Sequence, residues 1–127
     1  MSVAGIGVDT VDLIRFKKAV KEWGDRFVEK IFTQKEITYA ETKGDRSMHM
    51  AGKFAAKEAV KKALPDGAEI GLAWTEIEIL NGGDGKPYVF LNGHAVALME
   101  RANLERILVS ISHTKTVAVS NAIAIKR

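Results

Sequence analysis

Cysteine is absent from this chain of 127 residues, and proline occurs only twice. The lack of cysteine excludes disulfide bonds and thiolate chemistry. No apolar run approaches the eighteen or so residues that a membrane-spanning helix needs, so we expect no membrane partner. Met1 leads almost directly into a strand pattern, which leaves no room for a signal peptide and predicts a cytoplasmic protein of bacterial type.

The chain also lacks a large excess of either charge. The chain has 19 Lys and Arg against 16 Asp and Glu, a net charge of +3 and a pI of about 9.2. This mild excess suits an acidic partner, and a small nucleic-acid-binding module is one hypothesis. Aromatic residues make up only 7% of the chain, the basic residues are scattered among acidic ones, and no nucleic-acid motif is recognised. We therefore expect no nucleic-acid partner.

Hydrophobic periodicity predicts one α+β domain that covers residues 1–127, with an antiparallel sheet packed around a long central helix. A glycine-rich turn at 81–85 joins two of the expected strands in a hairpin. That turn is no phosphate loop, because it lacks the Gly-Lys-Ser/Thr that opens a helix. The expected strands are 3–11, 73–80, 86–91, 107–112 and 116–125, and the expected helices are 13–23, 26–32, 34–41, 45–64 and 93–102. Trp23 is expected on the inward face of the first helix, and 65–71 is expected to be a loop.

The central helix is bounded by a capping Asp45 and by Pro65. Alanine recurs along it every four residues from Ala51 to Ala63, which allows another element to approach its backbone closely. Beside this stripe Glu58 and Lys62 lie four residues apart on one face. The spacing alone also fits an ordinary surface ion pair, which contributes about 0.3–0.5 kcal/mol.

Two further residues end strands. Asp9 ends a strand face on which Gly5 and Gly7 replace side chains, and such glycines mark a close approach by a backbone or a ligand. His113 ends the strand 107–113 on the face of Val109 and Ile111, where a histidine is also compatible with a packing role. Asp9 is equally compatible with a turn or capping role. Carboxylates without clustered histidine or cysteine favour a hard cation such as magnesium over zinc.

At this point the sequence resembles a known family, the small bacterial holo-[acyl-carrier-protein] synthases, which are 4′-phosphopantetheinyl transferases. The resemblance covers nearly the whole chain, in one order and with similar spacings. It is carried by Gly5-Ile-Gly-Val-Asp9, Arg15-Phe16, Arg26-Phe27, Ile31-Phe32-Thr33 with Glu36, Gly52-Lys-Phe-Ala-Ala-Lys-Glu-Ala59 with Lys62-Ala63, Gly85-Lys-Pro87 and Ser110-Ile-Ser-His113.

The resemblance implies a reaction and a metal. A serine hydroxyl of apo acyl carrier protein attacks the β-phosphate of coenzyme A, and adenosine 3′,5′-bisphosphate leaves. Asp9 and Glu58 match the ligands of Mg²⁺, which also contacts the diphosphate, and Lys62 lies near the phosphates. Asp9, Glu58, Lys62 and His113 are thus the expected catalytic residues. Positions expected to line the coenzyme pocket are Lys53, Phe54, Lys57, Lys62, Lys86, Pro87 and His113.

The resemblance further implies a homotrimer with active sites between neighbouring subunits. Arg15, Arg26 and Lys30 match basic positions that face the acidic carrier protein. The sequence departs from the family at Lys53, where arginine is usual, and in a longer segment at 65–71. Lysine keeps the charge but loses bidentate phosphate recognition. A transferase domain cut from a larger synthase remains an alternative hypothesis.

Overall fold

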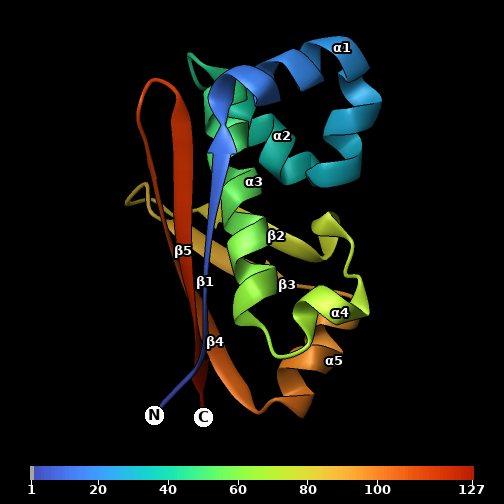
Figure 1. The fold of residues 1–127 in the computed structure, drawn as a ribbon, viewed down its shortest axis with the longest axis vertical. Helices are drawn as coiled ribbons and strands as arrows, with labels where there is room; N and C mark the ends of the chain where they lie inside the picture. The colour runs from blue at the N-terminus through green and yellow to red at the C-terminus, as the bar shows by residue number, and fades with distance from the viewer. Residues whose placement is uncertain (1) are drawn as a thin grey trace.

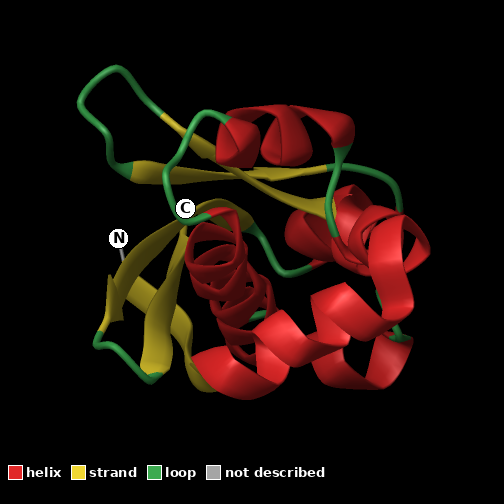
Figure 2. Cartoon of the chain, turned by 90° about the horizontal axis from the view of Figure 1, so that it is seen from above, coloured by secondary structure: helices red, strands yellow, loops and turns green. Residues whose placement is uncertain are grey.

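One helix, α3, lies at the centre of the molecule and contacts the sheet, the two-stranded ribbon and the other long helix (Figures 1 and 2). The computed structural model describes residues 2–127, without the side chains of 68 and 69. Its elements are β1 (Ser2–Asp12), α1 (Leu13–Ile31), α2 (Gln34–Glu41), α3 (Arg46–Ala63), α4 (Gly67–Ile70), the 3₁₀ turn η1 (Trp74–Glu76), β2 (Ile77–Asn81), β3 (Pro87–Leu91), α5 (His94–Arg101), β4 (Leu104–His113) and β5 (Val117–Lys126).

The strands form two antiparallel sheets rather than one. β1, β5 and β4 pair in that order, and β2 pairs with β3 in a separate ribbon. The α+β class and the central helix are confirmed, while the sheet is divided more than expected. On β5 the buried Ala118, Ala122 and Ala124 present a nearly flat inner face toward α3. In Figure 1 the three long strands run beside α3 for most of its length.

The close approach that the glycines of β1 predict is an approach by the backbone of α3. A Cβ atom on Gly5 would collide with the carbonyl oxygen of Ala63, and one on Gly7 with that of Ala59. The predicted alanine stripe is therefore buried where it meets the strand, since Ala59 is 0% and Ala63 2% exposed. The glycines allow β1 to lie directly on the helix.

Helix starts are well predicted by the sequence, because capping is local. Asp45 accepts a hydrogen bond from the Met48 amide at the start of α3. Thr33 and Glu36 form the predicted capping box of α2. Gly24, with φ of 69°, lies at a kink that divides α1 into two helical halves, in agreement with the two predicted helices.

Three local expectations are wrong. The strand expected from residue 73 begins only at Ile77, because Trp74–Glu76 form a 3₁₀ turn in which the Glu76 side chain accepts from the Ala73 amide. The segment 65–71 contains the short helix α4. Trp23, which the periodicity of α1 placed inward, is 66% exposed.

Among residues 2–127, no helix combines the length and apolar character required to cross a bilayer.

We predict that Gly7→Ala destabilises the fold by about 1–3 kcal/mol, because the new methyl group overpacks the contact between β1 and α3. Gly83→Ala is the matched control, since nothing lies within 4 Å of a Cβ there, and it should change stability by less than about 0.5 kcal/mol. Urea unfolding of both variants measures the difference. Equal stabilities would contradict the close packing.

Candidate active site

The first group of candidate residues lies where β1 passes α3. The Lys62 ammonium donates to Asp9 Oδ1 at 3.0 Å and to the Val8 carbonyl at 2.9 Å. Lys62 therefore pairs with Asp9 and not with Glu58, whose carboxylate lies 4.0 Å from Lys61. The ordinary Glu58–Lys62 ion pair that the spacing suggested is absent from the ion pairs of the described residues. Asp9, Glu58 and Lys62 together form what we call the carboxylate side of α3.

The carboxylate side has the donor set of an incomplete site for a hard cation. Asp9 and Glu58 offer carboxylate oxygens that could serve as ligands, and the described residues contain no group of three or more His, Asp or Glu side chains that would enclose a metal ion by themselves. Mg²⁺ is usually held by one or two carboxylates, with substrate phosphates and water completing its shell. The residues present fit such an ion when a phosphate ligand is also bound.

A second group surrounds a pocket of about 410 Å³ between the N-terminal half of α3, β4 and the turn from β2 to β3. We call it the α3–β4 pocket. It brings together three of the predicted residues, Lys53, Pro87 and His113. His113 is exposed, as its place at the end of β4 allows, and its Nδ1 lies 3.3 Å from the Thr114 carbonyl oxygen.

The wall of this pocket carries nitrogen atoms that lack partners within the described chain. Lys53 is only 2% exposed, and its Nζ atom has no hydrogen-bond acceptor, nor has His49 Nε2. The Lys53 ammonium lies 4.7 Å from the centre of the Tyr39 ring, a cation–π contact that offsets part of its desolvation. Buried donors without acceptors are costly, and an anion in the pocket would supply the acceptors.

The pKa values of Lys53 and His49 are both lowered, as expected for groups that are buried close to other positive charges. Burial lowers the pKa of Lys53 to about 8, against partial compensation by Glu36. Burial, with the positive charges of Lys53 and Lys43, lowers the pKa of His49 to about 4. At neutral pH Lys53 is thus charged and His49 is neutral. His49 was not identified from the sequence, although its position one turn before Lys53 places it on the same face of α3.

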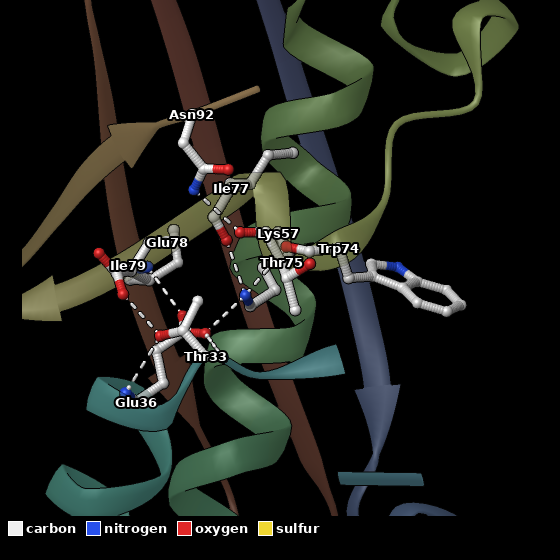
Figure 3. Close-up of polar contacts among 9 residues, drawn as sticks. All are labelled: Thr33, Glu36, Lys57, Trp74, Thr75, Ile77, Glu78, Ile79 and Asn92. Atoms are coloured by element: carbon white, nitrogen blue, oxygen red, sulfur yellow. Dashed lines mark hydrogen bonds and ion pairs between the residues drawn. The ribbon is translucent and has the colours of Figure 1, made fainter. Parts of the chain in front are cut away.

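Lys57, expected in the coenzyme pocket, is in fact enclosed by protein (Figure 3). Its side chain is 0% exposed and its ammonium donates to Glu36 Oε1 at 2.7 Å, to the Ile77 carbonyl at 2.6 Å and to the Trp74 carbonyl at 3.0 Å. Burial lowers the pKa of Lys57, while Glu36 favours the charged form. With its three donors used, Lys57 has none left for a ligand, and its assignment to the pocket is corrected.

Phe54 and Lys86 also lie outside the α3–β4 pocket. The Phe54 ring packs between Phe16 and Trp74, with ring centres 5.8 and 5.6 Å apart, so it belongs to the core. Lys86 is exposed and lines an adjoining groove of about 490 Å³, which shares Pro87 and Ile111 with the pocket. Lys86 thus remains within reach of a long ligand.

The basic residues expected to meet a carrier protein all lie on α1. Arg15, Arg26 and Lys30 are exposed there. Gly24 divides them, with Arg15 on the first half of the helix and the other two on the second.

The two groups of site residues point from opposite sides of α3. Lys53 and Lys62 are nine residues apart, which corresponds to about 180° around a helix of 3.6 residues per turn. Lys62 reaches β1, whereas Lys53 faces the pocket beside β4. β1 and β4 are the two edges of the three-stranded sheet. The chain therefore carries two separate groups of candidate residues on opposite sides of α3.

Comparison with known proteins identifies the class. Residues 5–119 match the family model of the 4′-phosphopantetheinyl transferase superfamily, and the chain belongs to that superfamily of transferases. A holo-[acyl-carrier-protein] synthase of Thermoanaerobacter sp. (strain X514) is 43% identical over 120 residues, which cover 94% of this chain and 86% of that protein. The holo-[acyl-carrier-protein] synthase of Alkaliphilus oremlandii is 42% identical over 97% of this chain and 99% of that protein.

Solved structures agree with the sequence matches. The crystal structure of Helicobacter pylori holo-[acyl-carrier-protein] synthase in complex with coenzyme A is 31% identical, with a TM-score of 0.81 over 94% of this chain and 98% of that one. The Neisseria meningitidis holo-[acyl-carrier-protein] synthase is 27% identical, with a TM-score of 0.85 over 98% of this chain and all of that one. The α+β fold predicted from the resemblance is thereby confirmed.

We predict that Lys53→Met raises stability at pH 7, by at most about 3 kcal/mol, because it removes a buried charge that Glu36 and the Tyr39 ring compensate only in part. The folded-state pKa of about 8 lies below the ordinary 10.5. The penalty is therefore complete below pH 8 and disappears as the pH rises to 10.5. Urea unfolding of both proteins at pH 7 and pH 10 measures this gain and its loss.

Lys43→Met is the matched control, because Lys43 contacts the same Tyr39 ring at 4.7 Å but is exposed. It should change stability by less than about 0.5 kcal/mol. A Lys53→Met variant that is less stable than the parent at pH 7 would show that the ammonium is satisfied in the free protein.

Proposed function

We propose that this chain transfers the 4′-phosphopantetheine group of coenzyme A to a serine of apo acyl carrier protein and releases adenosine 3′,5′-bisphosphate. The observation that carries the proposal is the presence of two groups of residues, the cationic α3–β4 pocket and the acidic carboxylate side of α3, on a chain whose relatives bear the name of that synthase. We treat each group as one half of an active site and call it a half-site. In fatty acid synthesis this transfer converts an inert carrier into one with a reactive thiol.

Coenzyme A is assigned to the α3–β4 pocket. Its phosphates would give Lys53 Nζ and His49 Nε2 the acceptors that they lack, and His113 with Pro87 would border the ligand. The adjoining groove with Lys86 extends the space available to an elongated molecule. The related synthase of Helicobacter pylori was crystallised in complex with coenzyme A, which supports the choice of ligand.

The chemistry requires charge neutralisation more than covalent help from the protein. The serine hydroxyl gives up its proton to water and its oxygen bonds to the β-phosphorus. The bond between that phosphorus and the bridging oxygen breaks, leaving the electron pair on the bisphosphate. Asp9 and Glu58 would hold Mg²⁺, which would neutralise the diphosphate charge when bound. Lys62 is 53% exposed at its side chain, so its ammonium can turn from Asp9 toward a phosphate oxygen.

The half-sites would meet in a homotrimer. A contact between the β1 edge of one subunit and the β4 edge of the next is heterologous, and such contacts form a ring when the rotation between subunits closes. The outer face of the sheet exposes Ile6 (71%), Val8, Leu108 and Ile123, around a groove of about 690 Å³. Exposed apolar patches of this kind mark interaction surfaces, and a ring would cover this one.

The carrier protein would dock on α1. Arg15, Arg26 and Lys30 are exposed there, and cationic rim residues increase the rate of association with an acidic partner in a salt-dependent way. These three positive charges suit a carrier whose recognition surface is acidic.

We predict that the chain, with coenzyme A and Mg²⁺, adds one phosphopantetheine group to apo acyl carrier protein, as measured by mass spectrometry. EDTA should abolish the gain in mass. Asp9→Ala and Glu58→Ala should each abolish turnover without unfolding the protein, because each removes an oxygen ligand of the ion. Loss of a metal-centred interaction of this kind costs roughly 100-fold or more in rate.

Glu100→Ala, which removes an exposed carboxylate on α5, is the matched control and should transfer at the parental rate. Near-normal activity in both Asp9→Ala and Glu58→Ala would overturn the metal assignment. No transfer to several different apo carriers would overturn the proposed function.

A further inference from the structure

The ion pair of Lys57 and Glu36 lies at the junction of three elements and is unused by the chemistry above. Glu36 lies in the first turn of α2, Lys57 lies in the middle of α3, and both contact β2. Both residues are fully buried as side chains. Burial of two charges is costly unless every donor and acceptor is satisfied. The stability of this pair therefore depends on the other hydrogen bonds that Glu36 and Lys57 make.

Here the charges are satisfied in full. Glu36 Oε1 accepts from the Thr33 amide at 2.8 Å as well as from Lys57, and Glu36 Oε2 accepts from the Ile79 amide at 2.8 Å. The same Thr33 donates its hydroxyl to Glu78 Oε2 at 2.6 Å. Figure 3 shows these bonds joining α2 to β2, with the ammonium of Lys57 on α3 bonded to Glu36 and to the Ile77 carbonyl.

On α3, Lys57 lies opposite the second contact that anchors the helix, the contact with β1. Ala59 and Ala63 hold β1 through its glycines. At about 100° per residue, Lys57 lies roughly 200–240° from these alanines. Glu58 and Lys62 fall between the two anchors, at about 100° and 140° from Lys57. Rotation of α3 about its axis is thus restricted from both sides, and Glu58 projects from the restricted surface.

We propose that Lys57 and Glu36 are a positioning pair for the carboxylate side of α3: they set the orientation of Glu58 and Lys62 and do not bind coenzyme A. This inference rests on the proposed function for its kinetic test but also makes a prediction about metal affinity that requires no turnover. Reacting groups displaced by about 1 Å can lose on the order of 100-fold in rate, so a small rotation of α3 suffices.

The test compares Lys57→Met, Glu36→Gln and the double variant, each at a temperature where circular dichroism shows it folded. Both single variants should lower kcat about tenfold or more at saturating substrates and Mg²⁺. The double variant should be no worse than the poorer single one within about threefold, because the two residues act as a unit. The affinity for Mn²⁺, measured by electron paramagnetic resonance in the presence of coenzyme A, should fall several-fold, while the Kd for coenzyme A in EDTA stays within about twofold.

Val28→Ala is the control for a loss of stability alone, since Val28 is a buried residue of α1, and it should keep the parental kcat and Mn²⁺ affinity. The positioning role is overturned if both single variants retain kcat within twofold, if Val28→Ala loses as much, or if Lys57→Met raises the Kd for coenzyme A at unchanged kcat. If Lys57→Met does not fold, Glu36→Gln decides by the same criteria. An inactive parent would refute the proposed function, and the Mn²⁺ affinities would still decide the positioning role.

Discussion

The close packing of β1 on α3 is the contact on which the rest of the structure depends. Without side chains at Gly5 and Gly7, the strand lies against the helix backbone at Ala59 and Ala63. The same contact brings Asp9 to Lys62, with 3.0 Å between Oδ1 and Nζ. A strand of larger residues would stand further from the helix, and the carboxylate of Asp9 would move away with it. The packing of β1 on α3 and the position of Asp9 beside Lys62 are therefore one feature of the fold.

Two lysines on α3, four residues apart, are buried to the same extent but differ in their hydrogen-bond partners. Lys57 has all three donors satisfied by Glu36 and two backbone carbonyls, and it stabilises the junction of α2, α3 and β2. Lys53 is just as enclosed but has no acceptor in the described chain. A buried donor without a partner costs stability in the free protein, and we interpret this cost as the requirement for an anionic ligand. Lys53 and Lys57 therefore have similar exposure, but we interpret Lys57 as a structural residue and Lys53 as a ligand-binding residue.

Much of the fold could be predicted from the sequence, because capping boxes, glycine stops and the alanine stripe act locally. The helix boundaries at Thr33 and Asp45 and the glycine-faced strand are examples. The 3₁₀ turn at Trp74–Glu76 could not be predicted from periodicity, because three residues that continue an alternating pattern read as part of the strand. The turn depends on the contact of the Glu76 carboxylate with the Ala73 amide. Nor could the partners of Lys57, because Glu36 is 21 residues away and only the folded chain brings it near. The resemblance named the residues of the site, but the structure was needed to divide them between two sides of α3.

In the proposed trimer a complete site takes its acidic half from one subunit and its α3–β4 pocket from the next, and subunit complementation tests this division most directly. Asp9→Ala and the double variant Lys53→Met/His113→Ala should each be inactive alone, and refolding them together in equal amounts would produce mixed trimers with one intact site each. We predict recovery of about a quarter of the parental activity, the statistical value for a three-membered ring. Mixed trimers of the expected mass without any activity would contradict a site shared between subunits.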